Sequence, residues 1–181
     1  MNYMELRQLR AFAWYDGIYL AIVWAASFAC FLAQTWLPML GDFSSVLILV
    51  TPFFAGYRLK LFRDVARDGI ISYRDGFFYS MRMFFNATWL FSLAQWAYMT
   101  FLDRGRMLRM VTAFCSTPEF EATLKEMNIR SDTFLKALPE ALEPYSLVVN
   151  GVVWELLSGV VISLIVAAIF ARKVKPRKLY N

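Results

Sequence analysis

Four long apolar stretches alternate with short polar segments along the chain. Each stretch holds roughly 19–26 residues, and a helix needs about 20 residues to cross the hydrocarbon layer of a membrane. Lipid offers no hydrogen-bond partner to a backbone amide, so each stretch is expected to be an α-helix. The pattern predicts an all-α polytopic membrane protein with one four-helix transmembrane domain over residues 1–181. The expected spans are about 17–37, 43–61, 77–102 and 146–171.

The ends and breaks of the first two spans can be read from local signals. Apolar residues at helical spacing within 4–15 predict an interfacial helix that leads into span one. Residues 27–30 loosely resemble a lipoprotein cleavage site, but the apolar stretch continues through Leu37, so an uncleaved span is expected. Pro38 should end this span. Pro52 lies near the middle of span two, where it predicts a kink and is a hinge candidate.

The segment between spans three and four, residues 103–145, predicts short amphipathic helices. Met107 and Phe114 belong to an apolar i, i+3, i+4, i+7 pattern. Residues 116–119 (STPE) are typical of a helix start, with a capping hydroxyl followed by proline and an acid. A further helix is expected from residues 131–132, stopped or bent at Pro139. We interpret these helices as a structural cap over the outer end of the bundle, and the alternative is a lid over a binding site.

The net charge of +5 is placed at the ends of the apolar stretches. This placement is typical of residues that set membrane orientation, and it argues against nucleic acid as a partner. It predicts that both termini and residues 62–76 are cytoplasmic, and that the first turn and residues 103–145 are outside. The bases of 62–76 should contact anionic lipid heads, or else form a docking face for a cytoplasmic partner. The twelve bases that lie at the ends of the apolar stretches are Arg7, Arg10, Arg58, Lys60, Arg63, Arg67, Arg74, Arg172, Lys173, Lys175, Arg177 and Lys178.

The residue types that most enzymes use are scarce. Histidine is absent, which removes the commonest general base and the commonest metal ligand. Cys30 and Cys115 lie far apart in the sequence, form no redox or metal motif, and are expected to be free. No phosphate-binding glycine loop and no metal-ligand cluster is present. The sequence therefore predicts no enzymatic activity, no cofactor and no metal site.

Small residues recur every four positions in spans one and four. In lipid, such ridges let helix backbones approach closely, so both spans are expected to make close helix contacts, and one interpretation is that they contact each other. A homodimer seam would look the same. The ridges are Ala13, Gly17, Ala21, Ala25, Ala29 and Ala33 in span one, and Gly151, Glu155, Gly159, Ser163 and Ala167 in span four.

Glu155 is the only acid well inside an expected span. A charged carboxylate there is costly, so it should be protonated, paired or hydrated, and its role is either structural or functional. Arg82 lies near the cytoplasmic end of span three, where it can snorkel to the interface or reach towards Glu155. Asn86 shares the face of Arg82. Thr88, Ser92 and Gln95 form a second polar stripe on the same span. The binding or transport candidates are Glu155, Arg82, Asn86 and Gln95.

The order of several short features resembles the bacterial four-helix membrane family known as domain of unknown function 4199. These features are YR at 57–58, DGIISY at 68–73, FF at 77–78, FLD at 101–103, PE at 118–119 and AIFARK at 168–173. Where a small glycine is expected in span three, this chain has Ser80. The resemblance implies a bacterial inner-membrane location and a gene neighbourhood with polyprenyl-phosphate sugar transferases. It transfers no catalytic residues.

Two functional hypotheses follow from the sequence. The first is a non-enzymatic inner-membrane bundle in contact with lipid, which acts as an anchor or accessory subunit for another membrane protein, such as a polyprenyl-phosphate sugar transferase. The second is a small transporter or lipid-carrier translocator that uses Glu155 and the polar residues of span three. A polar cavity that reaches Glu155 would favour transport. A tightly packed bundle with an exposed small-residue ridge would favour a partner subunit.

Overall fold

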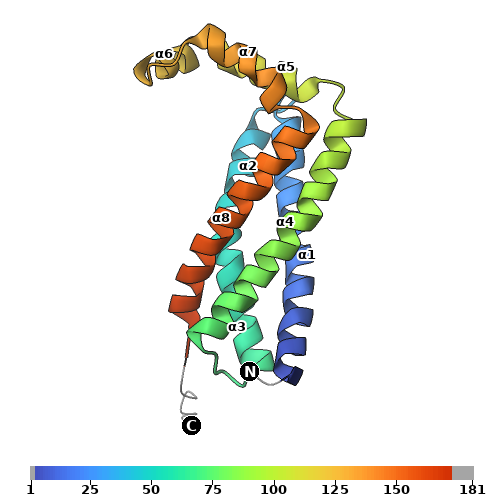
Figure 1. Cartoon of the computed structure of the whole chain (residues 1–181), viewed down its shortest axis with the longest axis vertical. Coiled ribbons are helices and arrows are strands. Elements are labelled where there is room, and N and C mark those ends of the chain that lie inside the picture. The colour runs from blue at the N-terminus through green and yellow to red at the C-terminus, as the bar shows by residue number, and fades with distance from the viewer. Residues whose placement is uncertain (1–2, 173–181) are drawn as a thin grey trace.

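The computed structural model describes residues 3–172, which form eight helices and, outside them, one isolated β-bridge. Helices α1, α2 with α3, α4 and α8 run side by side as an elongated bundle, and α5, α6 and α7 lie across one end of it (Figure 1). The all-α class predicted from the sequence is confirmed for the described residues. The helices are α1 (Tyr3–Ala33), α2 (Met39–Leu49), α3 (Thr51–Ala66), α4 (Tyr73–Phe101), α5 (Arg106–Cys115), α6 (Pro118–Glu126), α7 (Ser131–Ala141) and α8 (Pro144–Phe170).

Three helical segments are long and apolar enough to cross a membrane: Tyr3–Ala33, Met39–Ala66 and Pro144–Phe170. The bundle surface carries many exposed large apolar side chains, including Ile22, Trp89 and Ile169. Water would disfavour so much exposed apolar surface, whereas lipid accepts it. The apolar helices therefore indicate a membrane protein. Helix α4 is equally long but more polar, and it is not among the three.

The first helix begins as predicted and ends earlier than predicted. Residues 4–15 are helical and run into span one, because α1 continues unbroken through them. Leu9 is 3% exposed and Ala13 is fully buried, so this segment belongs to the core of the bundle. The helix ends at Ala33, four residues before the expected Leu37. Pro38 occupies the N-cap position of α2, so it begins the second helix as well as closing the first turn.

Span two is interrupted beside Pro52, the residue at which a kink was predicted. Regular α-helix stops at Leu49 and resumes at Thr51, with Pro52 in the first turn of α3. Proline has no amide hydrogen to donate, so the first turn of a helix is the place where it costs least. Val50 bridges the two helices, accepting a 2.9 Å hydrogen bond from the Phe54 amide. Motion at Pro52 remains a prediction.

The short helices between α4 and α8 follow the predicted pattern closely. The Thr117 hydroxyl caps α6 by accepting a hydrogen bond from the Phe120 amide, and Leu124 on the apolar face of α6 is buried. The expected stop at Pro139 was wrong, because α7 passes through this residue and ends at Ala141. Proline removes one hydrogen bond there, but this occurs in the last turn, where the helix is already ending.

The charged segment 62–76 is shorter and more ordered than the expected solvated loop. Helix α3 continues to Ala66, and Ser72 caps α4 by accepting a 3.1 Å hydrogen bond from the Asp75 amide. Arg63 is 2% exposed and donates to the Phe170 carbonyl at 3.2 Å, which satisfies the C-terminus of α8. Arg67 forms an ion pair with Glu5. These two bases therefore join helix ends, rather than being free for lipid heads or a docked partner.

The small-residue ridges of α1 and α8 make the predicted close helix contacts, but each packs against α4, which lies between them, and they do not face each other. A Cβ at Gly17 would lie 2.6 Å from Asn86 Cβ on α4. A Cβ at Gly159 would lie 2.9 Å from Phe84 Cγ, also on α4. The ridge of α1 is buried at Ala13, Gly17 and Ala21, half-buried at Ala25 and exposed at Ala29; on α8, Gly159, Ser163 and Ala167 are buried and Gly151 is half-buried. The central helix of the bundle is therefore α4.

Candidate functional site

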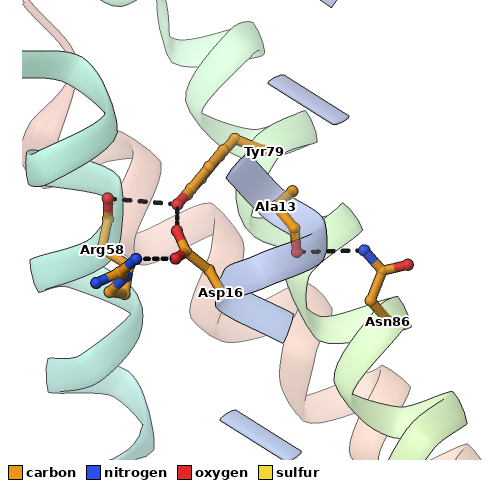
Figure 2. Close-up of polar contacts among 5 residues, drawn as sticks. All are labelled: Ala13, Asp16, Arg58, Tyr79 and Asn86. Atoms are coloured by element: carbon orange, nitrogen blue, oxygen red, sulfur yellow. Dashed lines mark hydrogen bonds and ion pairs between the residues drawn. The ribbon is translucent and has the colours of Figure 1, made fainter. Parts of the chain in front are cut away.

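The first polar cluster inside the bundle joins Asp16 of α1, Arg58 of α3 and Tyr79 of α4 (Figure 2). The Arg58 guanidinium donates to one carboxylate oxygen of Asp16, and the Tyr79 hydroxyl donates to the other. Asp16 is 1% exposed. The Arg58 guanidinium also lies over the Tyr19 ring, 5.4 Å from its centroid. The cluster connects three helices at one point.

This cluster holds α1, α3 and α4 together. Both carboxylate oxygens of Asp16 have donors, and the Tyr79 ring stacks on Phe62 at 4.5 Å between centroids. The arginine balances the carboxylate, so the pair carries no net charge into the bundle. Removing one partner of such a buried pair costs about 3–5 kcal/mol, because the other charge is left uncompensated. With its acid and base engaged with each other, the cluster offers no group poised for chemistry.

Sequence reasoning missed this cluster. It did not single out Asp16, which directly precedes the expected span 17–37, and it counted Arg58 among the bases at the ends of the apolar stretches. One signal was available: Asp16 adjoins Gly17, a member of the small-residue ridge of α1. Because Gly17 lets α1 approach α4 closely, its neighbour is drawn into the bundle.

The structure separates two of the four candidate residues from the others. Asn86 is buried, and its Nδ2 donates to the Ala13 carbonyl at 3.2 Å, which links α4 to α1 (Figure 2). Arg82 is exposed and lies over the Phe85 ring, 5.8 Å from its centroid. The alternative in which Arg82 pairs with Glu155 is wrong: no ion pair to Glu155 forms within residues 3–172, because Arg82 points outwards from α4.

The other two candidates, Gln95 and Glu155, lie together at the contact between α4 and α8. A Cβ built on Gly151 would lie 3.5 Å from Gln95 Oε1 and 3.6 Å from Glu155 Oε1. Both oxygens therefore border the space that this glycine leaves open. Thr88 also lies close to the Glu155 carboxylate, without forming a well-oriented hydrogen bond. Glu155 is eleven residues into α8, about 16 Å along the helix axis.

Unpartnered polar atoms concentrate at this contact. Six of the eight buried side-chain atoms without a hydrogen-bond partner, among the described residues, belong to α4 or α8. A buried polar atom without a partner costs about 1–3 kcal/mol, so such a concentration needs an explanation. The six are Ser80 Oγ, Thr88 Oγ1, Ser92 Oγ, Gln95 Oε1, Glu155 Oε2 and Ser163 Oγ.

A groove of about 280 Å³ runs along the outside of the same helix pair. Its surface is almost entirely apolar, because the hydroxyls of Thr88 and Ser92 are buried in the helix contact while their carbon atoms line the groove. This groove therefore provides no polar path to Glu155. Its lining residues are Phe85, Thr88, Trp89, Ser92, Leu93, Trp96, Val148, Val152 and Leu156.

The two cysteines lie apart and both are free, as predicted. Cys30 is half-buried in α1, and Cys115 is buried at the end of α5. Burial raises the pKa of the Cys115 thiol above its usual value. A buried thiol of this kind is poorly nucleophilic, so Cys115 does not add a reactive centre to the chain.

Comparison with known proteins gives one match. The model of the family described as "Protein of unknown function (DUF4199)" matches residues 15–172, which cover nearly all of the bundle and the short helices at its end. No curated protein and no solved structure matches the chain.

Proposed function

The chain belongs to the DUF4199 family, and we propose that it is a non-enzymatic bacterial inner-membrane protein that serves as an anchor or accessory subunit for another membrane protein. The proposal includes four membrane spans, with α4 as the fourth. Helix α4 has 29 residues and is about 43 Å long, which exceeds the hydrocarbon thickness. It exposes Phe85, Trp89 and Leu93 beside the apolar groove, a surface suited to lipid.

The proposed orientation has both termini in the cytoplasm and residues 103–145 in the periplasm. Its support is the positive-inside tendency of short loops. The start of α1, the connection between α3 and α4, and the end of α8 lie at one end of the bundle, while α5, α6 and α7 lie at the other (Figure 1). Bases flank the first of these ends. Four of them, Lys173, Lys175, Arg177 and Lys178, lie outside the described residues.

The accessory role is supported chiefly by the C-terminal half of the α1 ridge, which is left partly exposed. The N-terminal half of the ridge packs inside the bundle, against α4. Ala25 is half-buried and Ala29 is exposed, so small side chains remain on the outside of the helix. In lipid, an exposed ridge of this kind lets a further helix approach closely, from a partner or from a second copy of the chain. The proposed partner class, a polyprenyl-phosphate sugar transferase, is supported by the family resemblance alone.

Co-purification tests this role. The tagged protein, extracted from its native membrane in mild detergent, should retain a stoichiometric membrane partner or a second copy of itself. Ala29→Leu should weaken that association at least tenfold, because the larger side chain keeps the helices apart. Ala168→Leu is the matched control, since Ala168 is an exposed alanine on α8, away from this ridge. Equal retention by both variants would refute the proposed use of the α1 ridge.

A small transporter is the second candidate function. The observation in its favour is the group of unpartnered oxygens around Glu155. Uptake of a solute by sealed proteoliposomes, lost in Glu155→Gln and retained in Ala29→Leu, would favour transport over the accessory role.

A further inference from the structure

We propose that the contact between α4 and α8 holds a binding site for one dehydrated monovalent cation, and that Na⁺ fits this site. The ligands are four side-chain groups: the Thr88 hydroxyl, the Ser92 hydroxyl, the Gln95 carbonyl oxygen and the Glu155 carboxylate. We call these four groups the oxygen cluster. This inference goes beyond the accessory role and does not depend on it.

The spacing of the residues brings the oxygen cluster together. Thr88, Ser92 and Gln95 occupy positions i, i+4 and i+7 of α4, so they share one face of that helix. Glu155 lies on the facing ridge of α8, one helical turn after Gly151. Gln95 Oε1 and Glu155 Oε1 lie 3.5 and 3.6 Å from the point where a Gly151 Cβ would stand, and Glu155 Oε2 is the carboxylate oxygen without a partner. Glycine thus leaves a small space bordered by oxygens from both helices.

The ligand atoms are buried, and within the described residues they lack well-oriented hydrogen bonds, although the Thr88 hydroxyl lies close to the Glu155 carboxylate. Thr88 is 3% exposed and Ser92 is 6% exposed. Gln95 Oε1 and Glu155 Oε2 are also inaccessible and unpartnered. Oxygen atoms without hydrogen-bond partners are the groups that replace the hydration shell of a hard cation. One bound ion would satisfy all four groups, and this would remove the cost of burying them.

The charge of the oxygen cluster selects the class of cation. Its single ionisable group is Glu155, and no ion pair to Glu155 is present within the described residues. The nearest basic candidate, Arg82, is exposed on another face of α4. A monovalent cation would make the site neutral, which a low-dielectric environment favours. A divalent cation would leave a net charge, because no group of three or more acidic, histidine or cysteine side chains occurs in the described part of the chain.

A proton is the competing occupant. A proton on Glu155 would turn one carboxylate oxygen into a donor, and the Thr88 and Ser92 hydroxyls carry donors of their own. Hydrogen bonds among these groups would then take the place of the cation, and the dependence of stability on Na⁺ distinguishes the two occupants.

Thermal unfolding of the purified protein tests the site directly. The full chain in detergent at pH 8 should melt at a temperature that rises with NaCl and saturates, while choline chloride at equal ionic strength gives no rise. Glu155→Gln should abolish the Na⁺-dependent shift. Ser92→Ala should raise the apparent Kd for Na⁺ about tenfold, which corresponds to about 1.4 kcal/mol. Ser80→Ala is the matched control, because Ser80 Oγ is buried and unpartnered on α4 but lies outside the cluster.

Each alternative result contradicts the proposal. A melting temperature equal in Na⁺ and choline would refute the cation site. If that common temperature also rises from pH 8 to pH 6 in the parent but not in Glu155→Gln, the occupant is a proton. A Na⁺ shift that survives in Glu155→Gln, or an equal loss in Ser92→Ala and Ser80→Ala, would place the ion elsewhere. Should Glu155→Gln fail to fold, the contrast between the two serine variants still decides the question.

Discussion

The backbone of Gly17 lies directly against the side chain of Asn86. A Cβ at Gly17 would stand 2.6 Å from Asn86 Cβ and 3.0 Å from the Met83 carbonyl oxygen. One turn earlier on α1, the Ala13 carbonyl accepts a 3.2 Å hydrogen bond from Asn86 Nδ2. Close approach and hydrogen bonding therefore coincide at one contact between α1 and α4. This contact lies beside Asp16, which is also buried.

Gly17→Ala is therefore expected to destabilise the bundle. The new methyl group forces α1 and α4 apart, and overpacking of this kind costs about 1–3 kcal/mol. Thermal melting in detergent should show a lower transition temperature. Gly76→Ala is the control, because the nearest atom to a Cβ there, Leu59 Cδ2, lies at an ordinary 3.4 Å. If Gly17→Ala melts no lower than Gly76→Ala, the contact is looser than described.

Asp16→Ala is expected to be among the most damaging single substitutions in the chain. It leaves the Arg58 guanidinium without its carboxylate inside the bundle, at a cost of about 3–5 kcal/mol. Tyr79→Phe removes one donor and should cost about 1–3 kcal/mol. Asp132→Ala breaks an exposed ion pair with Arg130 and should change stability by less than about 1 kcal/mol. Unfolding of all three variants by denaturant checks this order. A stable Asp16→Ala variant would show that the Asp16 cluster does not hold the three helices together.

The proposed orientation can be checked by labelling single cysteines in sealed cells. After Cys30 and Cys115 are replaced by alanine, Asp132→Cys in α7 should react with an impermeant maleimide added from outside. Tyr73→Cys, at the start of α4, should react only after the membrane is opened. Labelling of Tyr73→Cys but not Asp132→Cys from outside would invert the proposed orientation, and labelling of both from outside would contradict α4 as a membrane span.

The natural Cys115 should react slowly with maleimide in the folded protein at pH 7. Burial raises the pKa of its thiol, so the reactive thiolate is scarce, and the sulfur is shielded as well. The rate should rise with pH and should increase sharply once the protein is unfolded in detergent. A variant that retains Cys115 as its single cysteine provides the measurement. Equal rates in the folded and unfolded states would show that α5 does not bury this residue.

Local features of the chain were enough to predict its helices. Long apolar runs require helices in lipid, and the Thr117 cap and Pro52 acted within a few residues of their own position. The amphipathic pattern of 103–145 likewise predicted short helices there. Errors fell at ends where a local signal was weak, as at Pro139, because a proline near a helix end costs little.

The tertiary structure decided which helices meet and which polar groups face each other. The small-residue ridges of α1 and α8 predicted close contacts, but only the assembled bundle shows that α4 is the partner of both. In the sequence, Asp16 stands at the edge of a span. Its partner Arg58 lies 42 positions away on α3, so no local pattern could reveal the pair. Glu155 stood out in the sequence, whereas its lack of a partner depends on where Arg82 and Gln95 point. Periodicity and capping act along the chain, while burial and pairing of charges act across it, so only the fold could determine them.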